Sequence, residues 1–500
     1  MHNPGSAEPQ LGSKVPAAEL AIPGSAEPQL GSNVPAAELG LGVPRDVPKG
    51  YKRTEVGVIP EEWETSTIGE EFNIQLGKML DSEKNIGVPK PFLGNRSVQW
   101  GRVDVSDLGT IKLTNSDIER FRLREGDLLV CEGGEVGRAA IWTKPLDECY
   151  YQKALHRLRT RRGYSVEVAS YLLHRYASVG ALSDFVTQTS IAHLPKDKFE
   201  KLPIPVPPSA EQRAIAEALG DVDALLGALD AAIAKQRDLK QAAMQQLLTG
   251  QTRLPGFQGE WEVKRFGELT VPRKDRVDPS QPDVKGLCIE LEHIESGAGR
   301  LLGCAEIRQG SSLKSCFYAG DILFGKLRAY LKKFWLADRE GFCSTEIWVF
   351  ATDSNKMAAG FLSQIVRTAD FVDAASLSYG THMPRSDWKV LQNFEVRVPC
   401  IDEQQAIAAI LSDIDTALTT LESRRTKTAA LKQAMMQELL TGRIRLPGAP
   451  GTSPARVTLG TPSPSSARVD SRAELGLGAP RDGASRDGAP RDDASGTRLV

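Results

Sequence analysis

The sequence LKQAAMQQLLTGQTRLPG, from Leu239 to Gly256, occurs again as LKQAMMQELLTGRIRLPG from Leu431 to Gly448, 192 residues later. The two stretches are identical at 14 of 18 positions. Such a repeat indicates an internal duplication, and 500 residues are more than one hydrophobic core usually organises. We therefore expect two related halves, each ending in this segment.

The regions upstream of the two segments carry matching motifs in the same order. Short alternating runs such as DLLV, ALHRLR, EIWVF and FEVRVP are typical of strands, whereas SVEVASYLLHRYAS and MAAGFLSQIVRTADF are typical of helices. Each half is therefore predicted to be a mixed α+β domain followed by one long helix. The matching motifs are IPEEWETSTIGE with FQGEWEVKRFGEL, LREGDLLVCEGG with FYAGDILFGKL, and EQRAIAEALGDVDALL with EQQAIAAILSDIDTAL.

Apolar residues recur at spacings of four and three along each predicted helix, a pattern typical of a coiled-coil seam. Because both helices share one phase, we expect them to pair with each other, antiparallel; packing of each helix on its own domain is the alternative. Ser209, with Gln212 three residues on, is a candidate N-cap, and Gly250 and Gly442 are suited to end the helices. The seam residues are Ile215, Leu219, Val222, Leu226, Leu229 and Ile233, then Ile407, Leu411, Ile414, Leu418 and Leu421.

Composition restricts the class of protein. A net charge of -2 and a pI near 6.4 mean that any nucleic-acid surface must be a local concentration of Lys and Arg. Seven cysteines without a C-x-x-C pair, and six histidines without H-x-x-x-H spacing, favour buried thiols over disulfides or a zinc site. No signal-type segment or membrane-length apolar run is present. We expect a cytoplasmic protein without a membrane partner.

Both ends of the chain are rich in Pro, Gly, Ser and Ala and contain short repeats. AELGLGVPRD at Ala37, for example, recurs as AELGLGAPRD at Ala473. Such segments have too few apolar residues for a core, so we expect them to be disordered. The predicted organisation is a tail over 1–49, a first domain over 50–205, a first helix and spacer over 206–256, a second domain over 257–398, a second helix and spacer over 399–448, and a tail over 449–500.

Catalytic motifs are weak or missing. GDILFGKL nearly matches a phosphate-binding loop, but Leu327 replaces the Ser or Thr that coordinates magnesium, so we reject nucleotide binding. Asp283, Glu290 and Glu292 resemble nuclease carboxylates, but the expected lysine is missing and a partly exposed strand is favoured. No D-P-P-Y or N-P-P-F motif, dinucleotide glycine fingerprint or G-x-S-x-G elbow is found. We assign no catalytic residue and no metal ligand.

Two domain-helix units with paired antiparallel helices would have pseudo-twofold symmetry. Such an arrangement can contact a DNA duplex at two places on one face, as dimeric DNA-binding proteins do. The similar helices indicate the same docking surface at both ends, for two copies of one partner. The dissimilar domains indicate two different half-sites.

Several motifs carry a family resemblance. YKRTEVGVIPEEWE, GDLL, GDILFGKLRAYL, LPIPVPPSAEQRAIAEAL, and LLTG followed by RLPG resemble the DNA-specificity subunit of type I restriction-modification enzymes, from about Tyr51 to Gly448. The resemblance implies two target-recognition domains that read an asymmetric bipartite site in double-stranded DNA. It also implies two copies of a modification subunit that methylates adenine with S-adenosylmethionine, and a restriction subunit that uses ATP and Mg. This chain would bind no cofactor and would not be an enzyme by itself.

The segment KALHRLRTRR is the clearest candidate for DNA contact in the first half. In a strand, Arg157, Arg159 and Arg161 would share one face because side chains alternate. Neighbouring guanidinium groups repel unless an anion faces them, although a solvated edge strand with protective charges is the alternative. The resemblance favours phosphate contact. We then expect Arg159→Ala to weaken binding to all sequences and to flatten its salt dependence.

In the second half, KLRAYLKK is the corresponding basic segment, with a solvated face as the alternative. Two polar loops, Thr187–Phe199 and Ser378–Lys389, precede the long helices and could reach base edges, or could simply close each domain onto its helix. We expect Gln188→Ala to change preference at one half-site only. The candidate DNA-binding residues are Lys153, Arg157, Arg159, Arg161, Arg162, Gln188, Thr189, Ser190, Lys196, Lys326, Arg328, Tyr330, Lys332, Lys333, Tyr379, Thr381, His382 and Arg385.

Overall fold

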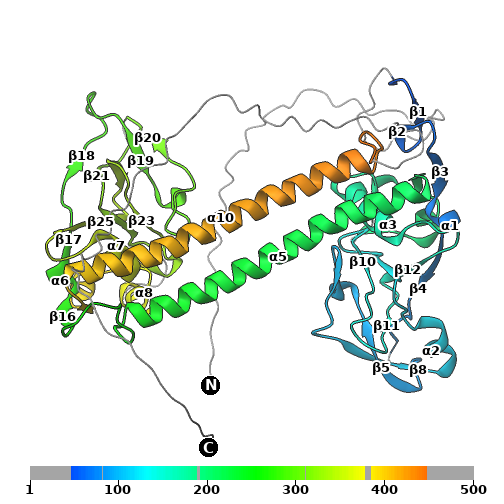
Figure 1. Cartoon of the computed structure of the whole chain (residues 1–500), viewed down its shortest axis with the longest axis horizontal. Helices are drawn as coiled ribbons and strands as arrows, with labels where there is room; N and C mark the ends of the chain where they lie inside the picture. Colours follow the sequence, from blue (N-terminus) through cyan, green and yellow to red (C-terminus); the bar gives the residue numbers. More distant parts are fainter. Residues whose placement is uncertain (1–46, 82, 189–191, 310, 378–383, 447–500) are drawn as a thin grey trace, which may run out of the picture. The chain divides into compact units, whose positions relative to one another are not determined.

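The computed structural model describes residues 47–81, 83–188, 192–309, 311–377 and 384–446, all of which belong to one compact unit of the chain. Each half contains a mixed domain of strands and short helices followed by a long helix (Figure 1). This confirms the predicted two-domain α+β class. The predicted tails, apart from residues 47–49, lie outside the described residues. Their disorder and the domain boundaries stay predictions.

The first half is built around a four-stranded antiparallel sheet of order β10-β9-β12-β4. Its strand β9 is apolar throughout because both of its faces are covered: Leu128 and Val130 enter one core cluster, and Leu129 and Cys131 enter another. The bounds of the strands are β1 Tyr51–Thr54, β2 Gly57–Pro60, β3 Glu64–Thr67, β4 Phe72–Leu76, β5 Val88–Leu93, β6 Val98–Gln99, β7 Arg102–Val103, β8 Gly109–Leu113, β9 Leu128–Cys131, β10 Ala139–Ile141, β11 Tyr150–Tyr151, β12 Leu155–Thr160, β13 Thr187–Gln188, β14 Ala192–His193 and β15 Pro203–Val206.

The second half repeats this plan. Its antiparallel sheet has the order β23-β22-β25-β17, and the two-stranded antiparallel pair β16-β26 corresponds to β3-β15. A five-stranded sheet, β18-β21-β24-β19-β20, replaces the three-stranded sheet β11-β5-β8 of the first half. The bounds are β16 Glu262–Arg265, β17 Thr270–Pro272, β18 Arg276–Val277, β19 Leu287–Ile289, β20 Ala305–Glu306, β21 Lys314–Phe317, β22 Ile322–Gly325, β23 Phe334–Leu336, β24 Gly341–Ser344, β25 Ile347–Thr352 and β26 Glu395–Val398.

Most short helices begin at residues suited to the position. Ser165 caps α3, for example, by accepting the Val168 N–H at 3.1 Å. The helical prediction for MAAGFLSQIVRTADF is confirmed, and the segment forms two helices because Thr368 caps the second one. The bounds are α1 Ile68–Glu71, α2 Asn115–Phe121, α3 Val166–Ser178, α4 Lys196–Phe199, α6 Phe266–Leu269, α7 Ala359–Ile365, α8 Ala369–Ser376 and α9 Trp388–Leu391, with 3-10 turns η1 Asn95–Ser97, η2 Ser183–Phe185, η3 Leu291–His293 and η4 Ala329–Leu331.

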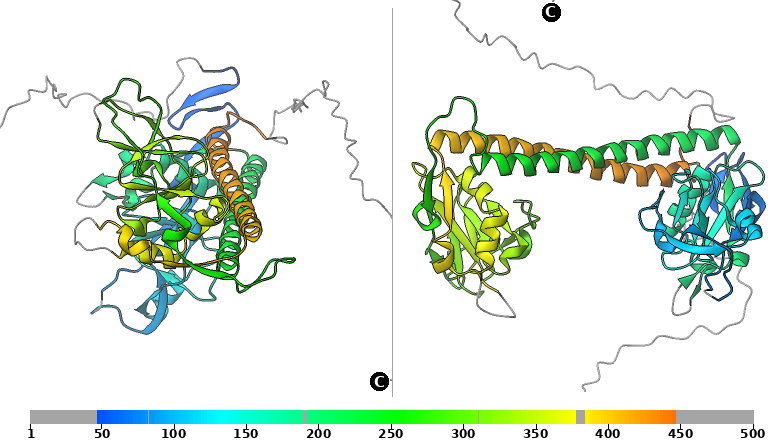
Figure 2. Two further views of the ribbon diagram at one scale, coloured as in Figure 1. Left: turned by 90° about the vertical axis from the view of Figure 1, so that its left-hand side faces the viewer. Right: turned by 90° about the horizontal axis from the view of Figure 1, so that it is seen from below.

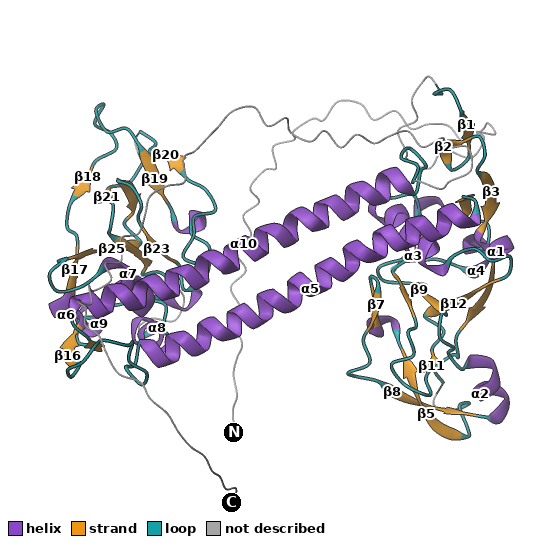
Figure 3. Ribbon diagram, viewed as in Figure 1, coloured by secondary structure: helices purple, strands orange, loops and turns teal. Residues whose placement is uncertain are grey.

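The long helices α5, Ser209–Leu247, and α10, Ile401–Leu439, have 39 residues each and lie side by side (Figures 2 and 3). The start of α5 shares one buried cluster with the first domain and with the end of α10. The end of α5 shares the corresponding cluster with the second domain and the start of α10. The helices therefore run in opposite directions, and both ends of the pair are part of a domain core.

The predicted helix ends need one correction. Ser209 is the first residue of α5 instead of its N-cap, because Pro208 takes that position without a side-chain hydrogen bond. Gln212 instead ties the helix to the first domain, accepting the Ser165 N–H at 2.8 Å. Gly250 and Gly442 have φ of +74° and +67°, the left-handed conformation that suits glycine after a helix.

The structure also bears on other features singled out in the sequence. The loop-like motif GDILFGKL contains strand β22. The partly exposed strand favoured for Asp283, Glu290 and Glu292 is wrong, because strand β19 ends at Ile289. Glu290 precedes the turn η3 and pairs with Lys314 at 2.7 Å, and Glu292 is exposed within η3. Four cysteines are buried as expected, but Cys304 and Cys400 are exposed. Over the described ranges, no helix has the length and apolar character to cross a membrane, and no cluster of three or more His, Cys, Asp or Glu suits a metal ion.

Candidate functional site

The end of the second half closes onto the start of the first through a buried ion pair. The carboxylate of Glu211, in the first turn of α5, is 1% exposed. It accepts two hydrogen bonds from Arg445, at 2.5 and 2.8 Å, and one from Trp63 Nε1 at 2.8 Å. Gly442 lies against the Trp63 ring, so the chain can turn here only without a side chain.

The same arrangement occurs at the other end of the helix pair. Glu403, in the first turn of α10, is fully buried and accepts two hydrogen bonds from Arg253, both at 2.7 Å. These bonds raise the pKa of Arg253. Arg253 also lies over the ring of Trp261, and Gly250 packs against that ring. Each half thus supplies the arginine that neutralises the other half's glutamate.

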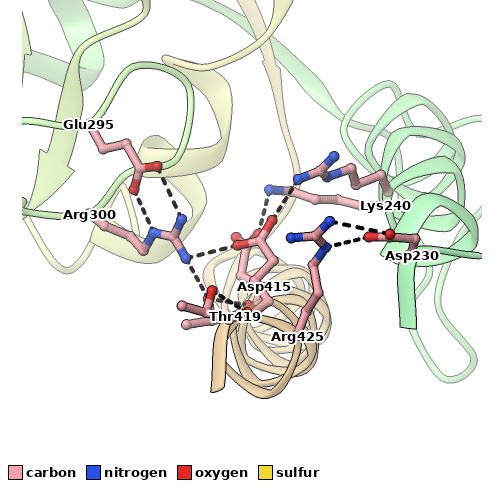
Figure 4. A network of polar contacts seen from close by, with 10 residues as sticks. Asp230, Lys240, Glu295, Arg300, Asp415, Thr419 and Arg425 are labelled. Atoms are coloured by element: carbon pink, nitrogen blue, oxygen red, sulfur yellow. Dashed lines mark hydrogen bonds and ion pairs between the residues drawn. The ribbon is translucent and has the colours of Figure 1, made fainter. Parts of the chain in front are cut away.

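A second reciprocal pair lies further along each helix. Asp223 of α5 binds Lys432 of α10 at 2.6 Å and accepts the Tyr171 hydroxyl at 2.8 Å. The equivalent residues of the other half, Asp415 and Lys240, bind each other in the same way (Figure 4). The helices are therefore held by ion pairs related by the pseudo-twofold axis, and each aspartate is also bonded to its own domain.

The predicted seam residues divide into two groups. The first turns of each helix lie in a domain core. There each helix packs on its own domain, which was the alternative, and also on the end of the other helix. In the middle, ion pairs connect the helices directly, Asp230 with Arg425 and Arg237 with Glu422. The buried seam residues are Ile215, Leu219, Leu229, Ile233, Ile407 and Leu411, and the half-buried ones are Val222, Leu226, Ile414, Leu418 and Leu421.

The basic strand of the first half differs from expectation. Arg157 is only 4% exposed, so it does not present its charge to a duplex in this structure. Arg159 already pairs with an anion inside the domain. The buried Asp127 carboxylate accepts hydrogen bonds from Arg159 Nε at 2.5 Å and from Nη2 at 2.8 Å. Arg161 follows the end of β12 and donates to the Gly69 carbonyl at 3.2 Å. The interpretation of Arg157 and Arg159 as free arginines awaiting a phosphate is therefore corrected, whereas contact of the exposed Arg161 with DNA stays a prediction.

Two other basic residues of this segment remain accessible. Lys153 is exposed. Arg162 is also exposed, and it forms long ion pairs with Glu70 at 3.7 Å and with Glu71 at 3.6 Å. Charges in this position can still approach a phosphate. Contact of Lys153 and Arg162 with DNA stays a prediction.

The basic segment of the second half forms a strained turn. Arg328 and Lys332 flank η4 with φ of 54° and 50°, a left-handed conformation that costs a non-glycine residue about 1–2 kcal/mol. Neighbouring segments hold the turn in place: the Arg328 N–H donates to Pro384 O at 2.9 Å, and the Lys332 carbonyl accepts the Gly297 N–H at 2.9 Å. The turn displays Tyr330, 54% exposed. Strain maintained by surrounding contacts is characteristic of functional sites.

The rest of this candidate set is unevenly available. Arg328 is exposed, and Lys326 is half-buried. Lys333 donates to the Leu291 carbonyl at 2.7 Å, and Arg385 forms an ion pair with Glu346 at 2.9 Å that raises its pKa. Arg328 can therefore contact a phosphate without breaking a bond, whereas Lys333 and Arg385 would first have to release their present partners.

The two polar loops contact the segments that follow β9 and β22, at corresponding places in the two halves. Leu194 donates its N–H to Glu132 O at 2.7 Å, and Ser386 donates to Lys326 O at 2.9 Å. The structure thus brings each loop beside the segment that follows β9 or β22. Lys196 pairs with Glu200 at 3.4 Å. Thr189, Ser190, Tyr379, Thr381, His382 and the side chain of Gln188 lie outside the described residues.

Sequence reasoning gave no role to the residues of the reciprocal clamps, Glu211, Arg253, Glu403 and Arg445. A signal was present: both glutamates open the matching EQ motifs, and both arginines lie in the repeated RLPG segment. A charged residue that is kept in both copies of a duplication, beside residues that differ, indicates a shared structural partner.

Comparisons with known proteins agree with this architecture. A family model described as the type I restriction modification DNA specificity domain matches residues 60–236 and 308–432. The chain is 24% identical over 421 residues to the type I restriction enzyme MjaVIII specificity subunit of Methanocaldococcus jannaschii, covering 78% of this chain and 94% of that protein. It is 26% identical over 196 residues to the EcoDI specificity subunit of Escherichia coli, covering 38% and 43%.

A solved structure supports the fold. The S subunit of the type I restriction-modification system from M. genitalium has a TM-score of 0.51 and 16% sequence identity, covering 76% of this chain and 96% of that one. At this identity the likeness concerns the fold alone.

Proposed function

The chain belongs to the family defined by the type I restriction modification DNA specificity domain, and from this premise we propose that it selects the DNA sites on which a type I restriction-modification complex acts. The site is bipartite and asymmetric. Each recognition domain reads one half-site, and the chain positions the methyltransferase and restriction subunits.

One observation carries this proposal: the two halves share a framework but differ where they would meet DNA. The four-stranded sheets of the two halves have equivalent strand orders, and the clamps are reciprocal. Yet the segment after β9 begins with Glu132 and Gly133, whereas the segment after β22 begins with Lys326 and Leu327 and continues into the strained turn. A common scaffold with unlike surfaces suits one partner bound twice and two different base sequences.

We further propose that α5 and α10 act as an antiparallel coiled-coil spacer that fixes the distance between the half-sites. Two modification subunits would dock near its two ends. Because the target adenine lies inside the base stack, the modification subunit must flip it out, and this chain would hold that subunit in register. S-adenosylmethionine, ATP and Mg would be used by the partner subunits in the cytoplasm, and this chain alone would be non-catalytic. The terminal tails would be disordered.

The test is to map methylated adenine in host DNA with and without this chain. The proposal predicts that methylation at one asymmetric bipartite motif disappears on deletion and returns with the chain. Exchange of residues 257–398 for those of a relative should change one half-site only. Methylation that is unchanged by deletion would refute it.

Two rival functions give different outcomes. A self-contained methyltransferase or nuclease would modify or cut DNA when the purified chain alone is given Mg and radiolabelled methyl donor. A scaffold that never touches DNA would fail to retard a duplex in a gel even with the modification subunit present.

A further inference from the structure

Glu422 of α10 has a polar contact with a recognition domain that its equivalent in α5, Asp230, does not have among the described residues. Asp230 and Glu422 occupy equivalent positions, 192 residues apart, and each accepts an arginine of the opposite helix, Arg425 or Arg237. Glu422 accepts a second arginine as well, Arg300 of the second recognition domain, at 3.1 Å. Within the described part of the first domain, no side chain is bonded to Asp230.

Arg300 is built to bridge between the domain and the helix. It lies on the loop between η3 and β20, where Glu295 holds its Nε at 2.7 Å and its Nη2 at 3.2 Å (Figure 4). Its remaining nitrogen, Nη1, reaches Glu422 at 3.1 Å and Thr419 at 3.4 Å. Burial alone would raise the pKa of Glu422, but the hydrogen bonds from Arg237 and Arg300 lower it. The carboxylate is therefore held as an anion between two guanidinium groups.

The corresponding hairpin of the first domain is directed elsewhere. It joins β6 to β7 and carries Trp100, which stacks on His174 of α3 with ring centres 4.4 Å apart. The Trp100 Nε1 donates to Glu135 of the same domain. This hairpin therefore packs on its own domain and is not bonded to the described residues of either long helix.

The space around Arg300 explains why this contact matters. A cavity of about 1500 Å³ lies between the second domain and the helices, and Arg237, Arg300 and Arg367 are among its lining residues. An apolar core joins the second domain to the ends of the helices beside this cavity, and polar bridges add to that attachment where the cavity is left unfilled. Arg367 binds Asp415 at 2.7 Å, and Glu422 lies seven residues, or about 10 Å, further along α10. Two ion pairs at separate points along α10 resist rotation of the second domain more than either ion pair alone.

We propose that Arg300 is a positioning residue that fixes the orientation of the second recognition domain against the helices and thereby narrows the range of half-site spacings that the complex accepts. This inference rests on the proposed function. It assigns Arg300 no contact with bases, so the sequence read at each half-site should not depend on it.

The experiment measures adenine methylation by the complex of this chain with its modification subunits on a library in which the spacing between the mapped half-sites varies by one base pair at a time. With Arg300→Met, we expect discrimination between the optimal spacing and its neighbours to fall by about threefold to tenfold, the effect of losing a partly exposed ion-pair network. Arg237→Met is the matched control, because it removes the other partner of Glu422 without touching the domain. Arg237→Met should leave the spacing profile sharp. So should Arg339→Met, which removes an exposed ion pair with Asp338 in the same domain.

The outcomes separate the inference from its premise. An unchanged spacing profile for Arg300→Met, or equal broadening by Arg237→Met, overturns the inference and leaves the proposed function intact. Altered base preference at the second half-site also overturns it, because Arg300 would then be a reader. Arg300→Met could lower the thermal midpoint so far that activity is lost. In that case the spacing profile of Glu295→Gln decides, because this variant only weakens the ion pair that holds Arg300 in place. Wild-type complex that methylates no bipartite site overturns both.

Discussion

Glu211 and Arg445 are joined by two hydrogen bonds although 234 residues separate them. Glu403 and Arg253 form the equivalent pair 150 residues apart. In each case the arginine that follows one long helix neutralises the glutamate that begins the other. The repeated LTG and RLPG segments are thus closing elements, since each completes the half that it does not belong to. Without the other half, the buried glutamate at the start of each long helix would lose its arginine partner.

Removal of one clamp arginine should be strongly destabilising. Arg445→Met leaves the Glu211 carboxylate buried with only the Trp63 indole as partner, and an uncompensated buried charge costs about 3–5 kcal/mol. We expect a lower thermal midpoint and faster hydrogen exchange at the end of α10. Arg443→Met removes a half-exposed pair with Glu438 and should cost less than about 1 kcal/mol. Equal effects of the two variants would contradict the clamp.

Glycine at the clamp turn is required for space as well as for conformation. A Cβ on Gly442 would lie 2.5 Å from Pro60 and 3.1 Å from Trp63, and its φ is +67°. Gly180 has a similar φ of +73° but open space around it. Gly180→Ala should therefore cost about 1–2 kcal/mol for the left-handed backbone alone, and Gly442→Ala distinctly more. Thermal midpoints that fall equally would show that the close approach is not limiting.

The two basic segments should respond differently to loss of charge. Arg328 is exposed, and its side chain has no partner among the described residues, so Arg328→Met should weaken binding to all DNA sequences and lower the salt slope by about 1, with an unchanged thermal midpoint. Arg159→Met instead leaves buried Asp127 unpaired and should lower the midpoint. Titrations at several salt concentrations, with melting curves, check both. An unchanged midpoint for Arg159→Met would restore it as a phosphate contact.

The framework could be predicted from the sequence because its signals are local. The strands DLLV and EIWVF, the helix beginning after Ser165 and the four-three spacing of the long helices were all confirmed as elements. Period-two and period-3.6 patterns depend on burial of one face, which a single sequence displays directly.

The candidate DNA contacts were harder because alternation does not say which face is exposed. Arg157 and Arg159 do share a face of β12, but that face points toward the buried Tyr151 and toward Asp127, which lies 32 residues before Arg159 in the chain. Only tertiary structure reveals such a neutralising carboxylate. The asymmetric bridge at Arg300 was invisible for the same reason, since it joins a domain loop to a helix 122 residues later.

A buried histidine makes the first domain sensitive to acid. His156 lies in β12, fully buried, with Nε2 at 2.9 Å from the Leu194 carbonyl and no partner for Nδ1 within the described structure. Burial lowers its pKa to about 4 from the ordinary 6.5. The unfolded chain therefore binds a proton more readily than the folded one, and stability is present above pH 6.5 and is lost as the pH falls toward 4. Between pH 7 and pH 5 the loss should be about 2 kcal/mol.

His156→Gln tests this effect, because the amide can still donate to Leu194 but does not titrate. We expect the fall in thermal midpoint from pH 7 to pH 5 to be smaller in His156→Gln than in the wild type, since all other groups titrate equally in both. His193→Gln removes an exposed histidine one residue before Leu194 and should keep the full wild-type fall. Because Leu194 also donates its N–H to Glu132, protonation of His156 would loosen the polar loop beside β9 before the domain unfolds. Duplex binding measured at pH 5 should therefore weaken in the wild type and in His193→Gln but less in His156→Gln, and an identical loss in all three would exclude His156 as the source.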